Sequence, residues 1–120
     1  MRLPQGFHSV TPRIVTRDVE GLVQFLKIVF GATGEIPDDR PAMIRIGDSL
    51  LMVSGEGPRA AMAAFLYVYV DDADGTFRRA VAAGARALED PLDMPYGDRR
   101  GMVEDPYGNV WQIATPRQAS

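Results

Sequence analysis

The chain of 120 residues carries 46% hydrophobic and 24% charged residues, a balance that excludes an extended disordered protein and predicts one globular domain. Its net charge of −3 argues against a nucleic-acid partner, because phosphates require a basic surface. The absence of cysteine excludes disulfides and thiolate sites, and the absence of an apolar leader or a membrane-length apolar run predicts a cytoplasmic protein without a membrane partner.

The first half of the chain predicts a strand, a helix and three further strands. The first strand covers TPRIVT, residues 11–16, and Asp18 after it can accept a backbone N–H at the start of a helix. Gly31 is expected to end this helix, whose predicted core face comprises Leu22, Val23, Phe25, Leu26 and Val29. Three extended segments follow: GEIPD (34–38), AMIRIG (42–47) and SLLMVSG (49–55).

The second half repeats this order when Asp72 is aligned with Asp18. The segment FLYVYV, residues 65–70, predicts a strand, and a helix should run from Asp72 to Gly84, with an apolar stripe of Phe77, Ala80 and Val81. Its three extended segments are ARALEDP (85–91), RRGMVED (99–105) and NVWQIAT (109–115). The repeat therefore predicts two tandem βαβββ modules, about 8–55 and about 64–116, joined by a linker at 56–63 in one domain spanning 1–120.

Alternation along the strands predicts which side chains face the helices. In FLYVYV one face is wholly aliphatic and the other is wholly aromatic, with Phe65, Tyr67 and Tyr69. In the last strand, Trp111 is expected in the core and Gln112 on the opposite face. The predicted fold class is α+β, with curved mixed sheets whose helices lie on the outer face and whose other faces line a cleft.

A turn is predicted at Asp105-Pro106-Tyr107-Gly108-Asn109, between the last two strands. Proline presets φ, and Gly108 or Asn109 is expected to take the left-handed conformation. Two arginines, Arg99 and Arg100, precede the turn. One of them is predicted to form an ion pair with Asp98, Glu104 or Asp105.

The paired modules resemble the vicinal oxygen chelate superfamily, which includes glyoxalase I, extradiol dioxygenases and bleomycin-resistance proteins, and in particular its PhnB-like branch. The matching pieces are VTPRIVTRD, FLKIVFGA, IRIGDSLLMVSGE, LYVYVDDADGTFRRAVAAGA and PYGDRRGMVEDPYGNVWQIAT. These pieces cover nearly the whole chain. The resemblance implies the glyoxalase/bleomycin-resistance fold.

Metal-dependent members of that superfamily hold a divalent ion with side chains from the sheets, typically His in the first strand of a module and Glu in its last. The corresponding positions here hold Thr11, Phe65, Gln112 and either Leu51 or Met52, between which the register is ambiguous. Phenylalanine, leucine and methionine do not ligate a hard divalent ion, and glutamine is a weak neutral ligand. The chain also has a single histidine. The sequence therefore predicts no metal and no cofactor.

The predicted ligand site combines aromatic rings with a few polar groups. The rings offer flat faces for stacking, Arg13 a charge-assisted hydrogen bond, and Gln112 both a donor and an acceptor. A loop tyrosine, Tyr96, is expected to cap the site. The predicted ligand-binding residues are Thr11, Arg13, Phe65, Tyr67, Tyr69, Tyr96 and Gln112, and no catalytic residue is identified.

These features favour a protein that binds a small, planar aromatic or amphipathic molecule without a metal, for sequestration or antibiotic resistance. Two alternatives stay open. One is an enzyme of the same superfamily, a lyase, isomerase or dioxygenase-like protein with an atypical or absent metal site. The other is a structural or regulatory dimer without a ligand. The resemblance implies a homodimer, and it leaves open whether the modules pair within one chain or across two.

Overall fold

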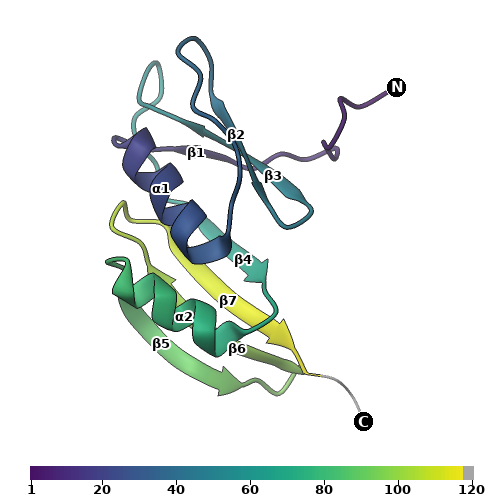
Figure 1. Ribbon diagram of the computed structural model, residues 1–120, viewed down its shortest axis with the longest axis vertical. Coiled ribbons are helices and arrows are strands. Elements are labelled where there is room, and N and C mark those ends of the chain that lie inside the picture. Colours follow the sequence, from purple (N-terminus) through teal and green to yellow (C-terminus); the bar gives the residue numbers. More distant parts are fainter. Residues whose placement is uncertain (118–120) are drawn as a thin grey trace. The chain divides into compact units, whose positions relative to one another are not determined.

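The structure, a computed structural model, describes residues 1–117 and divides the chain into two compact units, Met1–Ala63 and the segment from Ala64 onward (Figure 1). The first unit contains β1 (Arg13–Val15), α1 (Val19–Phe30), β2 (Ala42–Ile46) and β3 (Ser49–Ser54). The second contains β4 (Phe65–Tyr69), α2 (Ala73–Ala82), β5 (Arg86–Asp93), β6 (Asp98–Glu104) and β7 (Val110–Pro116). The predicted α+β class is confirmed, since the described part of each unit combines a helix with a sheet.

The first unit is a three-stranded sheet with the strand order β1-β3-β2, in which β1 runs parallel to β3 and β3 antiparallel to β2. One face of this sheet is buried, and its centre is formed by Ile14, Val53 and Ala42, each 1% exposed. All five residues of the predicted stripe on α1 are buried, so the apolar side of this helix contributes the rest of the core.

The helices begin where the sequence predicts. The carboxylate of Asp18 accepts a hydrogen bond from the backbone N–H of Gly21, and Asp72 does the same for Gly75. The first helix ends at Gly31, whose φ of 67° is left-handed. The second helix ends one residue before the predicted Gly84, because Ala83 is its C-cap. No helix within residues 1–117 is long and apolar enough to cross a membrane.

The first module differs from the predicted βαβββ order, because GEIPD, residues 34–38, forms no strand. Only Thr33 pairs with the sheet near this segment, through an isolated bridge to Arg45. Two features oppose pairing: Gly34 has a φ of 135°, far from strand values, and Pro37 lacks the N–H that a ladder needs. The first unit is therefore βαββ. Its first strand is also shorter than predicted, three residues rather than six.

The second unit follows the predicted βαβββ order, with the strand order β4-β7-β6-β5. The strand β4 runs parallel to β7, and the other neighbours are antiparallel. Figure 1 shows α2 lying along one face of this sheet, where Phe77 and Ala80 are buried. The prediction for Val81 was wrong: this side chain is 41% exposed, because it lies at the edge of the helical stripe.

The predicted turn at residues 105–109 is organised by one buried carboxylate. Asp105 is 3% exposed. Its oxygens accept hydrogen bonds from the backbone N–H and the side-chain amide of Asn109, from the backbone N–H of Tyr107 and from the indole N–H of Trp111. Gly108 takes the left-handed conformation, with a φ of 93°. The side chain of Asn109 accepts a hydrogen bond from Ala64, so the turn also fixes the approach to β4.

Candidate functional site

The aromatic residues of β4 stand in an exposed row on the sheet face opposite α2, as predicted. Phe65 is 68%, Tyr67 39% and Tyr69 60% exposed, and we call these three the aromatic row. The rings of Tyr67 and Tyr69 meet edge to face, with centroids 5.4 Å apart. Pairing of β4 with β7 places Gln112 directly beside Tyr67. The row and Gln112 therefore share one open face.

A carboxylate that the sequence did not assign to the ligand site anchors two residues of this row. Asp98, at the start of β6, is 8% exposed. The hydroxyls of Tyr67 and Tyr69 both donate to its Oδ2, over 2.6 Å and 2.9 Å. The hydroxyl of Tyr96, the predicted cap, lies 3.3 Å from that of Tyr67. Together these four residues form the tyrosine cluster. The sequence indicated Asp98 only as a possible ion-pair partner of Arg99 or Arg100, because the predicted strand began one residue later and left Asp98 outside the alternation pattern.

The environment of the tyrosine cluster favours protonated hydroxyls. Burial, followed by the hydrogen bonds to Asp98 and Tyr96, raises the pKa of Tyr67 well above its ordinary value. The hydrogen bond to Asp98 is the main cause that raises the pKa of Tyr69. Near neutral pH the two hydroxyls therefore act as donors to Asp98, and their own oxygens remain available as acceptors.

This arrangement predicts how stability responds to alkaline pH. A tyrosine whose pKa is higher in the folded state stabilises the fold fully below its ordinary pKa of about 10, and this contribution is lost as the pH rises through the folded values. We expect Asp98→Asn to shift tyrosine ionisation, followed by tyrosinate absorbance, to lower pH. The free energy of unfolding, measured with urea above the ordinary tyrosine pKa, should fall less steeply with pH in this variant than in the wild type. Identical titration curves for both proteins would contradict the role given to Asp98.

The arginines of β6 form ion pairs with partners other than those predicted. Arg99 donates two hydrogen bonds to Asp74 on α2, over 2.8 Å and 3.1 Å, and a third to Asp93. These bonds hold the pKa of Asp74 below its usual value. Arg100 pairs with Glu89 of β5. The prediction of Asp98, Glu104 or Asp105 as a partner was wrong, because packing of α2 on the sheet and pairing of β5 with β6 bring Asp74 and Glu89 to these guanidinium groups.

The positions that hold a metal in other members of the resembled superfamily do not fit one here. Within residues 1–117, no three His, Cys, Asp or Glu side chains gather so that they could hold a metal ion. The pairing of β1 with β3 resolves the ambiguous register: Met52 lies beside Arg13, whereas Leu51 is buried on the other face. A thioether and a neutral amide are poor ligands for a hard divalent ion. Metal independence itself stays a prediction.

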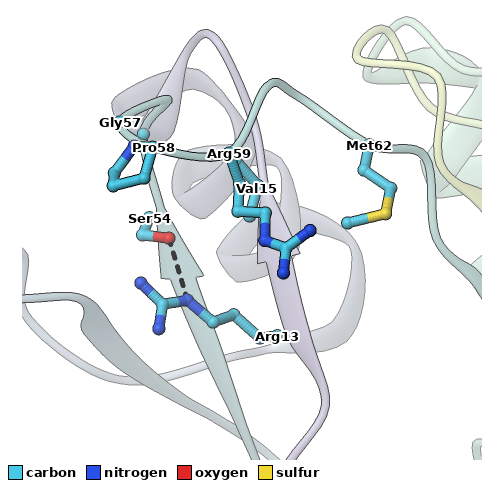
Figure 2. A pocket seen from close by; sticks show the side chains of 8 residues that line it. Arg13, Val15, Ser54, Gly57, Pro58, Arg59 and Met62 are labelled. Atoms are coloured by element: carbon cyan, nitrogen blue, oxygen red, sulfur yellow. Dashed lines mark hydrogen bonds between the residues drawn. The ribbon is translucent and has the colours of Figure 1, made fainter.

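The remaining predicted residues, Thr11 and Arg13, belong to the first unit. The Nε of Arg13 donates to the Oγ of Ser54 over 3.2 Å, and its side chain borders a pocket of about 390 Å³ (Figure 2). Thr11 precedes β1 and does not line this pocket. The structure thus gathers the aromatic row, Tyr96 and Gln112 in the second unit. Arg13 lines a pocket that is formed entirely by residues of the first unit.

Comparison with known proteins gives a consistent family and fold. The sequence model of the Glyoxalase/Bleomycin resistance protein/Dioxygenase superfamily matches residues 6–113. Uncharacterized protein Mb0911c of Mycobacterium bovis is 26% identical over 126 residues, covering 90% of this chain and 83% of that protein. The crystal structure of TioX from Micromonospora sp. ML1 has a TM-score of 0.75 and 25% identity, covering 94% of this chain and 99% of TioX. The fosfomycin resistance protein FosX from Mesorhizobium loti shares the fold at a TM-score of 0.69 and 20% identity, covering 90% of this chain and 91% of FosX.

Proposed function

The chain belongs to the glyoxalase/bleomycin resistance protein/dioxygenase superfamily, and from this membership we propose that it binds a small planar aromatic or amphipathic molecule. The binding is of the sequestration or resistance type, in the cytoplasm, and needs no metal. Within the superfamily we place the chain near the PhnB-like branch, on the motifs that it shares with that branch. A fold of this kind hosts many activities, so the proposal rests on the chemistry of one surface rather than on the fold.

The observation that carries the proposal is the exposed aromatic row above a buried carboxylate. Soluble proteins usually bury rings of this size, and here three neighbours in alternate positions of β4 remain open. A planar ligand stacked on such rings gains about 0.5–1.5 kcal/mol per ring pair beyond the burial of area. The hydrogen bonds to Asp98 restrict the two tyrosines, so less conformational entropy is lost when a ligand binds.

The polar edge of this surface indicates which substituents the ligand carries. The hydroxyls of Tyr67 and Tyr69 commit their protons to Asp98, so a ligand meets their oxygens as acceptors. Gln112, beside Tyr67, offers an amide with both donor and acceptor. A planar molecule with hydroxyl, amine or amide donors along one edge fits this pattern. Contact of the same ligand with Thr11 and Arg13 stays part of the prediction from sequence.

The test is a calorimetric and fluorescence screen of planar aromatic natural products and antibiotics against the wild-type protein. Because the tryptophan is unique and buried, its emission reports ligand binding only indirectly, and calorimetry is the primary measurement. We expect Phe65→Ala to weaken the affinity of a ligand found in the screen by about tenfold, through the loss of one stacking surface. A matched control is Val81→Ala, which truncates an exposed apolar side chain on α2. Equal affinities for wild type and Phe65→Ala would place the ligand elsewhere.

The same exposed row also favours a second candidate, a homodimer that buries this face between two copies. The sheet face carries further apolar area, because Leu92 is 61% exposed and lies in the row of Tyr69. Sedimentation equilibrium distinguishes the candidates: a dimer has twice the 13.1 kDa chain mass, and Phe65→Ala would dissociate it if the row forms the interface. A mass unaffected by this variant, together with ligand binding that requires Phe65, supports the binding function over the structural one.

A further inference from the structure

The first unit contains a pocket on the open face of its sheet, apart from the aromatic row of the second unit. The loop 55–62 leaves β3 and returns over the sheet, where the backbone N–H of Met62 donates to Val15 over 3.1 Å. The pocket there, of about 390 Å³, is open to solvent on one side and is lined by Arg13, Val15, Ser54, Gly55, Gly57, Pro58, Arg59 and Met62 (Figure 2). Its walls combine small residues and apolar side chains with two arginines.

The loop around this pocket is held in place by its own hydrogen bonds. The carboxylate of Glu56 accepts the backbone N–H of Ala61 over 2.7 Å, and it faces Arg17 at 3.6 Å. The backbone N–H of Gly57 donates to the carbonyl of Arg59 over 3.2 Å. These contacts direct the one acid of the loop toward Ala61 and Arg17. The pocket is therefore preformed, and the charge of Glu56 is engaged outside it.

The two arginines give the pocket an uncompensated positive charge. Among the described residues, neither Arg13 nor Arg59 forms an ion pair, which is also true of Arg2, Arg45 and Arg78, whereas Arg17, Arg40, Arg86, Arg99, Arg100 and Arg117 do. The Oγ of Ser54 accepts the Nε of Arg13, which orients this guanidinium and leaves its Nη groups free to donate (Figure 2). Asp38 shares a neighbouring hollow with Arg13 without pairing to it. Two like charges in one pocket are stabilised by an anion between them.

We propose that this pocket binds an oxyanionic group, a carboxylate or a phosphate, through Arg13 and Arg59. The planar fork of an arginine matches two oxygens of either group, and such charge-assisted bonds are roughly twice as strong as neutral ones. Ser54 acts as a positioning residue that fixes the fork of Arg13. The inference does not depend on the aromatic row, because every residue in it belongs to the first unit.

The test is an NMR titration of the arginine Nε–H resonances with sodium phosphate and, separately, with sodium acetate, each at constant ionic strength set by chloride. We expect saturable shifts of Arg13 and Arg59, with a dissociation constant on the order of 1 mM for at least one of the two anions. Stronger binding of phosphate than of acetate assigns the pocket to phosphoryl groups, and the reverse order assigns it to carboxylates. Both results support an oxyanion site.

Variants decide whether the two arginines carry the binding. Arg13→Gln and Arg59→Gln should each weaken binding about tenfold, which is the loss of one charge-assisted hydrogen bond. Arg78→Gln removes the same charge from an exposed position on α2 and should leave binding unchanged. Shifts that stay linear with concentration in the wild type, or equal weakening in all three variants, would show general charge attraction and overturn the proposal. Phe65→Ala should not alter phosphate binding, which separates this test from that of the aromatic ligand.

Discussion

Replacing Asp105 with alanine is expected to lower the free energy of unfolding by about 3–5 kcal/mol. The buried carboxylate accepts four separate N–H groups, from Tyr107, Asn109 and Trp111. Each donor left without a partner in the interior costs about 1–3 kcal/mol, and partial entry of water keeps the total below a simple sum. A loss of this size is a large fraction of the roughly 5–15 kcal/mol by which domains are stable.

Urea unfolding followed by tryptophan fluorescence measures this effect directly, because Trp111 is the only tryptophan of the chain and donates to Asp105. Asp105→Asn retains one acceptor oxygen, so its loss should be intermediate. Asp90→Ala removes an exposed carboxylate from β5 and should change the free energy by less than about 0.5 kcal/mol. If Asp105→Ala were no less stable than Asp90→Ala, the turn would not depend on its carboxylate.

Replacing Gly34 with alanine is expected to cost about 3 kcal/mol, the second largest effect. An added Cβ would lie 2.4 Å from the carbonyl oxygen of Met43 and 3.0 Å from the side chain of Ile44, which is fully buried. The φ of 135° adds backbone strain for any residue with a side chain. The chain cannot move away easily, because Thr33 forms two backbone hydrogen bonds with Arg45.

A matched control isolates the steric part of this effect. Gly47 is also left-handed, with a φ of 58°, but an added Cβ there would meet no atom within 4 Å. Gly47→Ala should therefore cost only about 1 kcal/mol. Urea unfolding of both variants by far-UV circular dichroism gives the comparison, and equal losses would mean that strain alone accounts for the effect. Tryptophan fluorescence, which reports only the second unit, would show whether the two units unfold together.

Patterns in the sequence correctly predicted the features that depend on local interactions. The exposure of the aromatic row followed from the two-residue period of a strand, which places Phe65, Tyr67 and Tyr69 on one side. The helix caps at Asp18 and Asp72 could be predicted because each depends on a hydrogen bond between residues three apart in the sequence.

Contacts between segments distant in the sequence followed from the packing of the folded chain. Asp98 meets Tyr67 only because β7 holds β4 and β6 in one register, and this register depends on packing across the whole sheet. Packing of α2 on the sheet brings Asp74 to Arg99, and pairing of β5 with β6 brings Glu89 to Arg100, at separations where charge patterns along the chain carry no information.

Two features of the first unit differ from the sequence prediction or were absent from it. The internal repeat predicted GEIPD as an extended segment, yet the backbone of Gly34 and the missing N–H of Pro37 kept it out of the sheet. The pocket with Arg13 and Arg59 could not be read from the sequence, because it exists only where loop 55–62 returns to β1. The local periodicity of a sequence specifies which side chains each face of a strand or helix presents. Strand register and loop closure fix which of these side chains come into contact, and both are properties of the packed chain.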